Sequence, residues 1–392
     1  VIRFSNLAVR NAWFSGGVEW NIGVIGHTPY TTDPLYTAVT KTESGAPVLR
    51  MYEYERIRKV PYQMDFWLDE EDCFLNCRMR IVNESEDVIP MYWWSNIAVP
   101  EYEGGHIVVP AKQAFTNRDN EVFKVDIPVV EGIDITDYKK IPKSVDYFFD
   151  LEKEKPKYIA NLDKNGYGLL QLFSWGNQQA SDHWQEFLTE NAGRYIEIQA
   201  GLAKTQYGCI PMAPHTAWEW IEQYGPVKID ESKADFSKME EQLTGLLVSQ
   251  KAPKKLEDLL EETEQMAKTK AELLIKGSSY GALKQHGNLA EHLEYVLEKD
   301  TLKKWKNFFE TGKLYEPETE EAPDEFLIDA ENLGFLQDTL KRENQDNWYA
   351  FYQAGIGAFA VEDFPCAEHY LLRSWERKHN PWACHGLACV CL

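Results

Sequence analysis

The chain has 392 residues, of which 44% are hydrophobic and 27% charged, a composition typical of a globular protein that can bury more than one core. Its 63 acidic side chains outnumber the 41 basic ones, which gives a formal net charge of -22. Because a field of this sign repels phosphate backbones and anionic lipids, we expect neither a nucleic acid nor a membrane as a partner.

Residues 1–228 are predicted to form a β domain. In the run 73–82, apolar and polar side chains alternate with a period of two, as in a strand with one buried and one solvated face. Similar runs, separated by connectors rich in Gly, Pro and Asn, predict strands at 91–98, 106–109, 168–173, 194–202 and 216–222. Many short strands without intervening helices favour a sandwich or barrel over a parallel sheet.

The pattern becomes helical after Pro226, and residues 229–325 are predicted to form a helical linker region. An apolar stripe from Leu256 to Ala267 predicts one helix that begins after Pro253 and ends at Gly277. The segment 315–325 is acidic and contains prolines, so we expect it to be a solvated loop.

Residues 326–392 are predicted to form tetratricopeptide-like helices. Trp348, Gly355, Gly357, Ala367 and Pro381 follow in an order that loosely matches one helix-turn-helix unit, in which small residues let two helices approach closely. One such unit cannot bury its own apolar face, so it is expected to pack on the preceding helices or to continue into further repeats. A protein partner that binds through these helices follows as a prediction.

The strongest candidate for chemistry is the run 193–201. Alternation places Tyr195, Glu197 and Gln199 on one face of the expected strand, with aliphatic residues on the other. If the polar face lines a concavity, Glu197 can act as a general base or nucleophile and Gln199 can orient a hydroxyl group. The alternative is an outward, solvated strand face.

A second candidate is the glycine-rich run 15–27, which holds Glu19, Trp20, Asn21 and His27. It is not a phosphate-binding loop, because it has no Lys-Ser/Thr pair and no strand-to-helix transition. Its glycines would let the backbone pass close to a ligand while Glu19 and His27 supply a proton donor. The alternative is a hydrogen-bonded structural histidine.

Aromatic residues are abundant, with 13 Trp, 20 Tyr and 18 Phe, and many stand beside polar residues. Flat rings next to hydrogen-bonding groups suit the faces of sugars, although packing in large β cores explains the same content equally well. The predicted ligand-binding residues are Gln199, Asn96, Trp20, Trp94, Trp175, Asn21 and Tyr195.

No metal site and no cofactor are expected. Asp182, His183 and Glu186 lie close together, but no second ligand pair follows at a diagnostic spacing.

These motifs together resemble a bacterial domain family of unassigned function. That family has a galactose-mutarotase-like (aldose-epimerase-like) β-supersandwich, often fused to tetratricopeptide repeats. The matching segments are 13–21 with His27, 93–99, 175–176 and 195–201, within about the first 225 residues. The resemblance implies a multidomain β plus α fold and a further N-terminal portion of the sandwich. In agreement, the chain begins at Val1 without a methionine, so we expect it to be a fragment.

More distantly, Glu197-Ile-Gln199 is similar to the Glu-x-Gln strand of aldose 1-epimerases, whose glutamate removes the proton of the anomeric hydroxyl group. By this resemblance Glu197 is the catalytic base. The Asn-His-Tyr element that carries the epimerase acid is not matched near Trp94, so His27 or Glu19 would have to replace it.

The leading hypothesis is a glycoside hydrolase that binds a glycan on the concave face of the sandwich, with Glu197 as base or nucleophile, Glu19 as general acid and His27 as a further catalytic residue. One alternative is an aldose 1-epimerase or mutarotase. The other is a non-catalytic carbohydrate-binding or scaffold protein that acts through its repeats.

A cytoplasmic location is expected from three features of the sequence. No run approaches the roughly 20 apolar residues of a membrane-spanning helix, and the first residues lack a signal-peptide pattern. Seven scattered cysteines, an odd number, favour reduced thiols.

Overall fold

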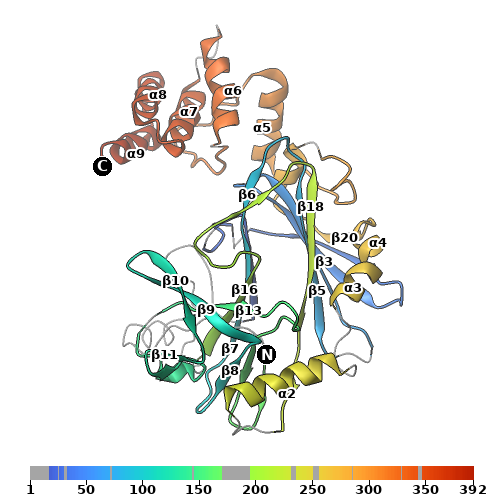
Figure 1. The fold of residues 1–392 in the computed structure, drawn as a ribbon. Coiled ribbons are helices and arrows are strands. Elements are labelled where there is room, and N and C mark those ends of the chain that lie inside the picture. Colours follow the sequence, from blue (N-terminus) through green and yellow to red (C-terminus); the bar gives the residue numbers. More distant parts are fainter. Residues whose placement is uncertain are drawn as a thin grey trace. The chain divides into compact units, whose positions relative to one another are not determined.

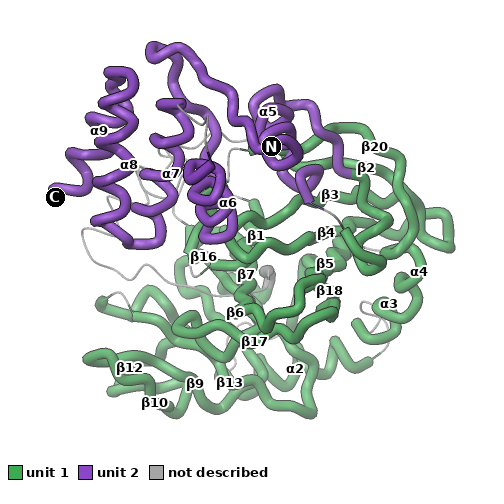
Figure 2. The backbone as a smooth tube through the Cα atoms, turned by 90° about the horizontal axis from the view of Figure 1, so that it is seen from above, with its two compact units in different colours: residues 1–278, 286–294 green, residues 279–285, 295–392 purple. Residues whose placement is uncertain are grey.

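The computed structural model describes residues 17–24, 26–30, 33–70, 73–143, 145–169, 195–230, 235–249, 256–284, 286–327, 329–342 and 347–392. The chain divides into two compact units, one of residues 1–278 and 286–294 and one of residues 279–285 and 295–392 (Figure 2). The first is rich in strands and the second is helical, so the predicted β plus α class is confirmed. The division differs from the predicted one, because residues 229–278 belong to the β-rich unit rather than to a linker.

The largest sheet of the first unit has six antiparallel strands in the order β18-β5-β4-β3-β2-β20 (Figure 1). Their bounds are β2 Tyr36–Lys41, β3 Pro47–Glu55, β4 Val60–Trp67, β5 Leu75–Asn83, β18 Thr216–Tyr224 and β20 Glu272–Ile275. Alternation along β5 turns Cys77, Met79 and Ile81 toward the main core. The prediction that its other face is solvated is wrong, because Arg78 and Arg80 are only 2% and 3% exposed.

A second sheet of three strands carries the polar residues singled out from the sequence. It consists of β1 Val18–Ile22, β7 Trp93–Pro100 and β16 Tyr195–Gly201 in the order β1-β7-β16. The inner faces of β7 and β16 contribute Trp93, Ile97 and Ile198 to the main core. Trp93 meets Trp220 of β18 with ring centroids 4.7 Å apart, which joins the two sheets through the core. Side chains at the alternate positions therefore lie on the outer face of this sheet.

Smaller sheets complete the first unit. They are formed by β6 Ile89–Met91 with β17 Ile210–Met212; by β8 His106–Val108, β14 Ala160–Leu162, β15 Tyr167–Leu169 and β19 Val227–Lys228; by β9 Ala111–Arg118, β10 Glu121–Asp126 and β13 Phe148–Leu151; and by β11 Val129–Val130 with β12 Ile133–Asp134. A 3-10 turn, η1, spans Tyr138–Lys140. Helix α2, Phe236–Val248, begins at Asp235, whose side chain accepts from the Lys238 N–H, and packs on β8 and β14 through Met239 and Leu243.

The single helix predicted between Pro253 and Gly277 is wrong. The structure has two short helices, α3 Leu256–Glu262 and α4 Glu264–Ala267, and then β20. Leu259 and Met266 of these helices pack on Trp67 at the outer face of the six-stranded sheet. The chain then forms β20, which pairs with β2, because the N–H and C=O groups at the free edge of the sheet offer hydrogen-bond partners to another strand.

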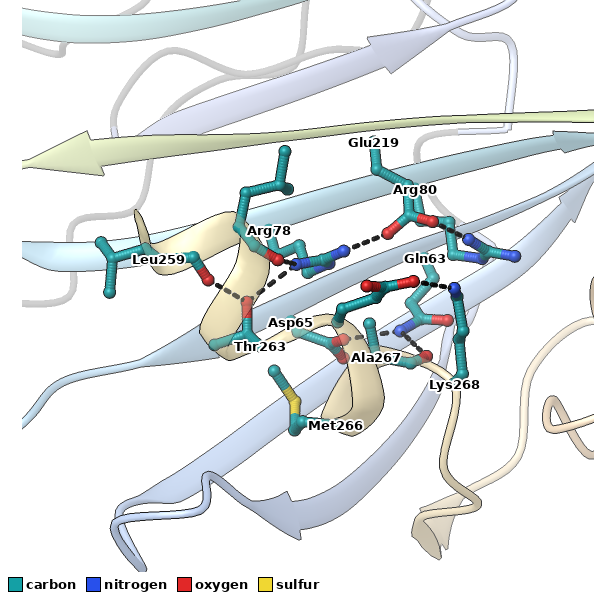
Figure 3. Close-up of polar contacts among 12 residues, drawn as sticks. Gln63, Asp65, Arg78, Arg80, Glu219, Leu259, Thr263, Met266, Ala267 and Lys268 are labelled. Carbon is teal, nitrogen blue, oxygen red and sulfur yellow. Dashed lines mark hydrogen bonds and ion pairs between the residues drawn. The ribbon is translucent and has the colours of Figure 1, made fainter. Parts of the chain in front are cut away.

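A network of charged side chains fixes α3 and α4 to the sheet, and we call Arg50, Asp65, Arg78, Arg80 and Glu219 the clamp. Figure 3 shows Asp65, Arg78, Arg80 and Glu219 beside Leu259 of α3, Met266 of α4 and Thr263 between these helices. Arg50 binds Asp65 through two hydrogen bonds of 2.6 and 3.1 Å and donates to the Met266 carbonyl oxygen. Arg78 and Arg80 both bind Glu219. Arg78 also donates to the Leu260 carbonyl oxygen at 2.7 Å, and these bonds explain why both arginines are covered.

The second unit consists of helices. They are η2 Tyr280–Leu283, α5 Asp300–Thr311, α6 Ala330–Lys341, α7 Trp348–Ala360, α8 Phe364–Arg377 and α9 Pro381–Val390. Close packing requires small residues at two positions, because a Cβ atom at Gly355 or Gly386 would lie 2.7 or 2.9 Å from side-chain atoms of Leu371. The acidic segment 315–325 is not simply solvated, since Trp348 and Trp382 donate to the carbonyl oxygens of Pro317 and Thr319.

Candidate functional site

The outer face of β1, β7 and β16 gathers polar side chains from three neighbouring strands. The register places Glu19 of β1 opposite Asn96 of β7, and Asn96 opposite Gln199 of β16. Glu197 lies two residues before Gln199, opposite Ala98. Because residues two apart on a strand share a face, these side chains all point away from the main core. We call Glu19, Asn21, His27, Asn96, Glu197 and Gln199 the polar cluster.

Glu197 is the most unusual group of this cluster. It is 4% exposed, and burial raises the pKa of its carboxyl group to about 8. A hydrogen bond from the Asn96 side chain opposes this pKa rise, and the nearby charge of Glu19 adds to it. No cation is among the causes of the shift, so Glu197 keeps its proton near neutral pH.

Glu19 and His27 form a pair beside Glu197. The Nδ1 atom of His27 lies 2.8 Å from a Glu19 carboxylate oxygen, and each side chain is 20% exposed. The segment around His27 is held to the sheet by two bonds: the Thr28 N–H donates to Asn21 Oδ1 at 2.9 Å, and Trp94 Nε1 donates to the Gly26 carbonyl oxygen at 3.3 Å. A proton carrier and a carboxylate therefore stand at the water-accessible side of a buried carboxyl group.

Amide groups supply hydrogen-bonding atoms around these three residues. Within the described part of the chain, Asn21 Nδ2 and Asn96 Oδ1 are buried and have no hydrogen-bond partner. The side-chain amide oxygen of Gln199 accepts from Gln206 Nε2. Buried polar atoms without partners are rare in folded proteins and are often found where a ligand or water binds.

The aromatic predictions fare differently from the polar ones. Trp20 was predicted as a stacking surface, and this is wrong, because its ring lies on the inner face and contacts Phe66 and Tyr224 at centroid distances of 5.1 and 6.3 Å. Trp94 lies on the outer face, but it is only 4% exposed, with its ring 5.5 Å from that of His27. Tyr195 shares the face of Glu197 and is 6% exposed. Trp175 lies outside the described residues.

A further residue of this site, not predicted from the sequence, is Gln206, which lies in the loop after β16 and donates to Gln199. No local pattern marks it, because the loop folds back onto its own strand. Among the described residues, no group of three His, Cys, Asp or Glu side chains is arranged to hold a metal ion. In the same part of the chain, no helix is long and apolar enough to cross a membrane.

The fold defines a class of proteins in which a β domain built on two facing sheets precedes paired helices. The whole chain aligns with a TPR-domain containing protein from Parabacteroides distasonis at 16% identity and a TM-score of 0.63. The match covers 100% of this chain and 64% of that one, so this chain spans less than two thirds of its length. Residues 1–217 match DUF5107, a domain of unknown function, and the chain belongs to this family.

Other solved structures overlap with half of the chain. A putative aldose 1-epimerase from Escherichia coli K12 is 10% identical, with 49% of this chain and 69% of that chain covered and a TM-score of 0.33. A galactose mutarotase-like protein from Clostridium acetobutylicum is 11% identical, with 49% and 67% covered and a TM-score of 0.34. The predicted membership of a domain family of unassigned function, fused to tetratricopeptide-like helices, is confirmed.

Proposed function

We propose that the outer face of β1, β7 and β16 binds a carbohydrate and hydrolyses a glycosidic bond. The observation that carries this proposal is a buried carboxyl group, Glu197, that keeps its proton near neutral pH while a second carboxyl group, Glu19, stands nearby paired with His27. Two carboxyl groups in different environments are what glycosidic hydrolysis requires, one as an acid and the other as a base.

The protonation of Glu197 reverses the roles expected from the sequence. Glu197 acts as the general acid and gives its proton to the glycosidic oxygen as the bond from that oxygen to the anomeric carbon breaks. A water oxygen bonds to the anomeric carbon, and Glu19 takes the proton that this water loses. His27 holds the Glu19 carboxylate through the 2.8 Å contact.

The positions of Glu19 and Glu197 in the sheet favour inversion over retention of the configuration at the anomeric carbon. Glu19 and Glu197 lie on strands separated by β7 and are offset by two residues along it. Ordinary sheet spacings then put their Cα atoms roughly 12 Å apart. Side chains that lean toward each other from this distance reach the separation of about 6.5–9.5 Å used in inverting enzymes more readily than the roughly 5 Å of retaining ones.

The amides of the polar cluster suit a ligand rich in hydroxyl groups. Asn21 and Asn96 present a donor and an acceptor without partners in the described part of the chain. A sugar hydroxyl group both donates and accepts, so it can satisfy both kinds of atom.

The second candidate is an aldose 1-epimerase. It is favoured by the His27 imidazole, which stands on the same face as Glu197 and gives the acid and base that ring opening needs without a leaving group.

A protein partner bound through the helices and a cytoplasmic location remain predictions.

The test is turnover of a panel of glycans and aryl glycosides, with polarimetry of free sugars in parallel, for the wild type and Glu197→Gln. Release of the inverted sugar by the wild type alone would support the hydrolase. Accelerated mutarotation without cleavage would move the assignment to the epimerase. Sugar binding without either reaction would contradict both and leave a carbohydrate-binding protein.

A further inference from the structure

The turn between β3 and β4, residues 56–59, contacts the segment that carries His27. This segment lies between Gly23 and Asp33. Gly23 ends the path from β1 into this segment, and its N–H donates to the Tyr92 carbonyl oxygen at 2.7 Å. Its own carbonyl oxygen accepts from Arg58 Nε at 2.6 Å. Gly23, the first residue after β1, is thus fixed between Tyr92, which links β6 and β7, and the turn.

Gly23 is required at this contact. Its φ is +83°, in the left-handed region, and a Cβ atom would lie 2.9 Å from Glu55 Oε2 and 3.0 Å from Arg58 Cγ. A side chain here would push the segment away from the turn.

The turn is itself rigid, because a buried carboxylate organises it. Glu55 is 4% exposed and accepts from the backbone N–H groups of Ile57 and Arg58. These bonds set the backbone from which the Arg56 and Arg58 side chains leave.

A second arginine of the same turn holds the far end of the segment. Arg56 binds the Asp33 carboxylate at 2.5 Å and lies over the Tyr30 ring, 4.2 Å from its centroid. His27 lies between the two points of attachment, Gly23 on one side and Tyr30 with Asp33 on the other.

We infer that Arg58 and Arg56 are positioning residues for His27. Neither belongs to the polar cluster; they act by fixing both ends of the segment so that the His27 Nδ1–H donates to Glu19. This inference rests on the proposed function for its catalytic meaning, but the position of His27 can be measured without any substrate.

The experiment records the ring nitrogen signals of His27 by NMR in protein labelled with ¹⁵N-histidine, assigned with His27→Asn. The wild type is expected to show one tautomer with the proton on Nδ1, and Arg58→Ala to show nitrogen shifts averaged between tautomers. Arg58→Lys keeps the charge and one donor, and it is expected to lie between them. In the enzyme assay, kcat/KM should fall about tenfold in Arg58→Ala, mainly through kcat.

Arg118→Ala is the control, because Arg118 is more than half exposed and pairs with Glu131 away from the segment. Circular dichroism establishes that each variant is folded; if Arg58→Ala is not, Arg56→Ala tests the other end of the segment. Wild-type nitrogen shifts in a folded Arg58→Ala or Arg56→Ala protein would overturn the inference. If the variants lose the Nδ1 tautomer but the wild type turns over no carbohydrate, the proposed function fails and the positioning role stands.

Discussion

The clamp and the polar cluster are two polar groups of residues in the same β unit, each on the face of a sheet turned away from the main core. In the clamp, Arg50 meets Asp65 and two arginines meet Glu219, and backbone carbonyl oxygens of the covering helices accept further bonds. In the polar cluster, Glu197 has an amide as its hydrogen-bonding neighbour and a second carboxylate nearby. Each arginine of the clamp therefore has a carboxylate partner, whereas no cation is among the causes of the Glu197 pKa shift.

A histidine near the clamp, His292, shows how strongly the surroundings set the protonation of a side chain. His292 lies 2.8 Å from Gln63, and burial together with the charges of Arg50, Arg80 and Lys268 lowers its pKa to about 3. It is therefore a neutral hydrogen-bonding group. Buried arginines that each have a counter-charge indicate a structural role, although Arg78 Nε and Arg80 Nε have no hydrogen-bond partner among the described residues. A buried carboxyl group with a raised pKa and no cation beside it indicates a site for ligands.

The largest difference between the two regions is expected from Glu197→Gln. The amide keeps the shape of the protonated carboxyl group but has no acidic proton, so turnover should fall about 10³-fold while the protein stays folded. Initial rates on the substrate found in the panel, with urea unfolding in parallel, measure both quantities.

Glu222→Gln is the matched control, because burial also raises the pKa of Glu222, to about 7, but its carboxyl group bonds Tyr224 and Ser95 rather than the polar cluster. The Glu222→Gln variant should keep the activity of the wild type. Equal losses of activity in both variants would show that raised pKa values in this unit do not mark the site.

A substitution in the clamp should instead lower the stability of the protein and leave its activity unchanged. Asp65→Asn leaves the Arg50 guanidinium, 1% exposed, without its counter-charge, which is expected to lower the free energy of unfolding by about 3 kcal/mol. Urea unfolding measures this loss, and the activity per folded molecule should stay unchanged. Glu131→Gln, which breaks an exposed pair with Arg118, should have no measurable effect on unfolding. An Asp65→Asn protein as stable as the wild type would contradict a structural role for the clamp.

The alternation of side chains with a period of two correctly predicted which residues of a strand share a face. It placed Glu197 with Gln199 and Trp94 with Asn96 on common faces, because a strand decides the direction of a side chain locally. The same rule could have placed Trp20 correctly, since it alternates with Glu19 and Asn21.

What covers a strand face is not local information. The solvated face predicted for β5 is buried because Arg78 meets the Leu260 carbonyl oxygen, 182 residues later in the chain. The partners of His27 and Gln199 depend in the same way on how loops return to the sheet. The helix predicted between Pro253 and Gly277 failed for a related reason, because residues 272–275 near its end pair with β2, which the periodicity of the segment cannot show.

A smaller effect is expected from the pair at the accessible side of the cluster. His27→Asn removes the imidazole that holds Glu19, and the rate should fall 10- to 100-fold, since the Glu19 carboxylate remains in place. Glu19→Gln should lose more, because it removes the base itself. Steady-state kinetics of the two single variants and the double variant measure this order. The hydrolase roles would be contradicted if His27→Asn were the more damaged enzyme, a result that the epimerase predicts.

The smallest expected effect is a slope of the free energy of unfolding against pH between pH 7 and 8, to which Glu197 contributes. The pKa of Glu197 is raised from 4.5 to about 8, so between these values the folded protein holds a proton that the unfolded chain releases. Stability therefore falls as pH rises, by about 1.4 kcal/mol per pH unit from this group. The pKa of Glu222 is raised to about 7 and adds a slope of the same sign below that pH. Unfolding of Glu197→Gln between pH 7 and 8 should lose the slope, and that of Glu222→Gln should keep it. Parallel curves for the wild type and Glu197→Gln would mean that Glu197 is ionised in the folded protein, and the acid of the proposed reaction would then have to be another group.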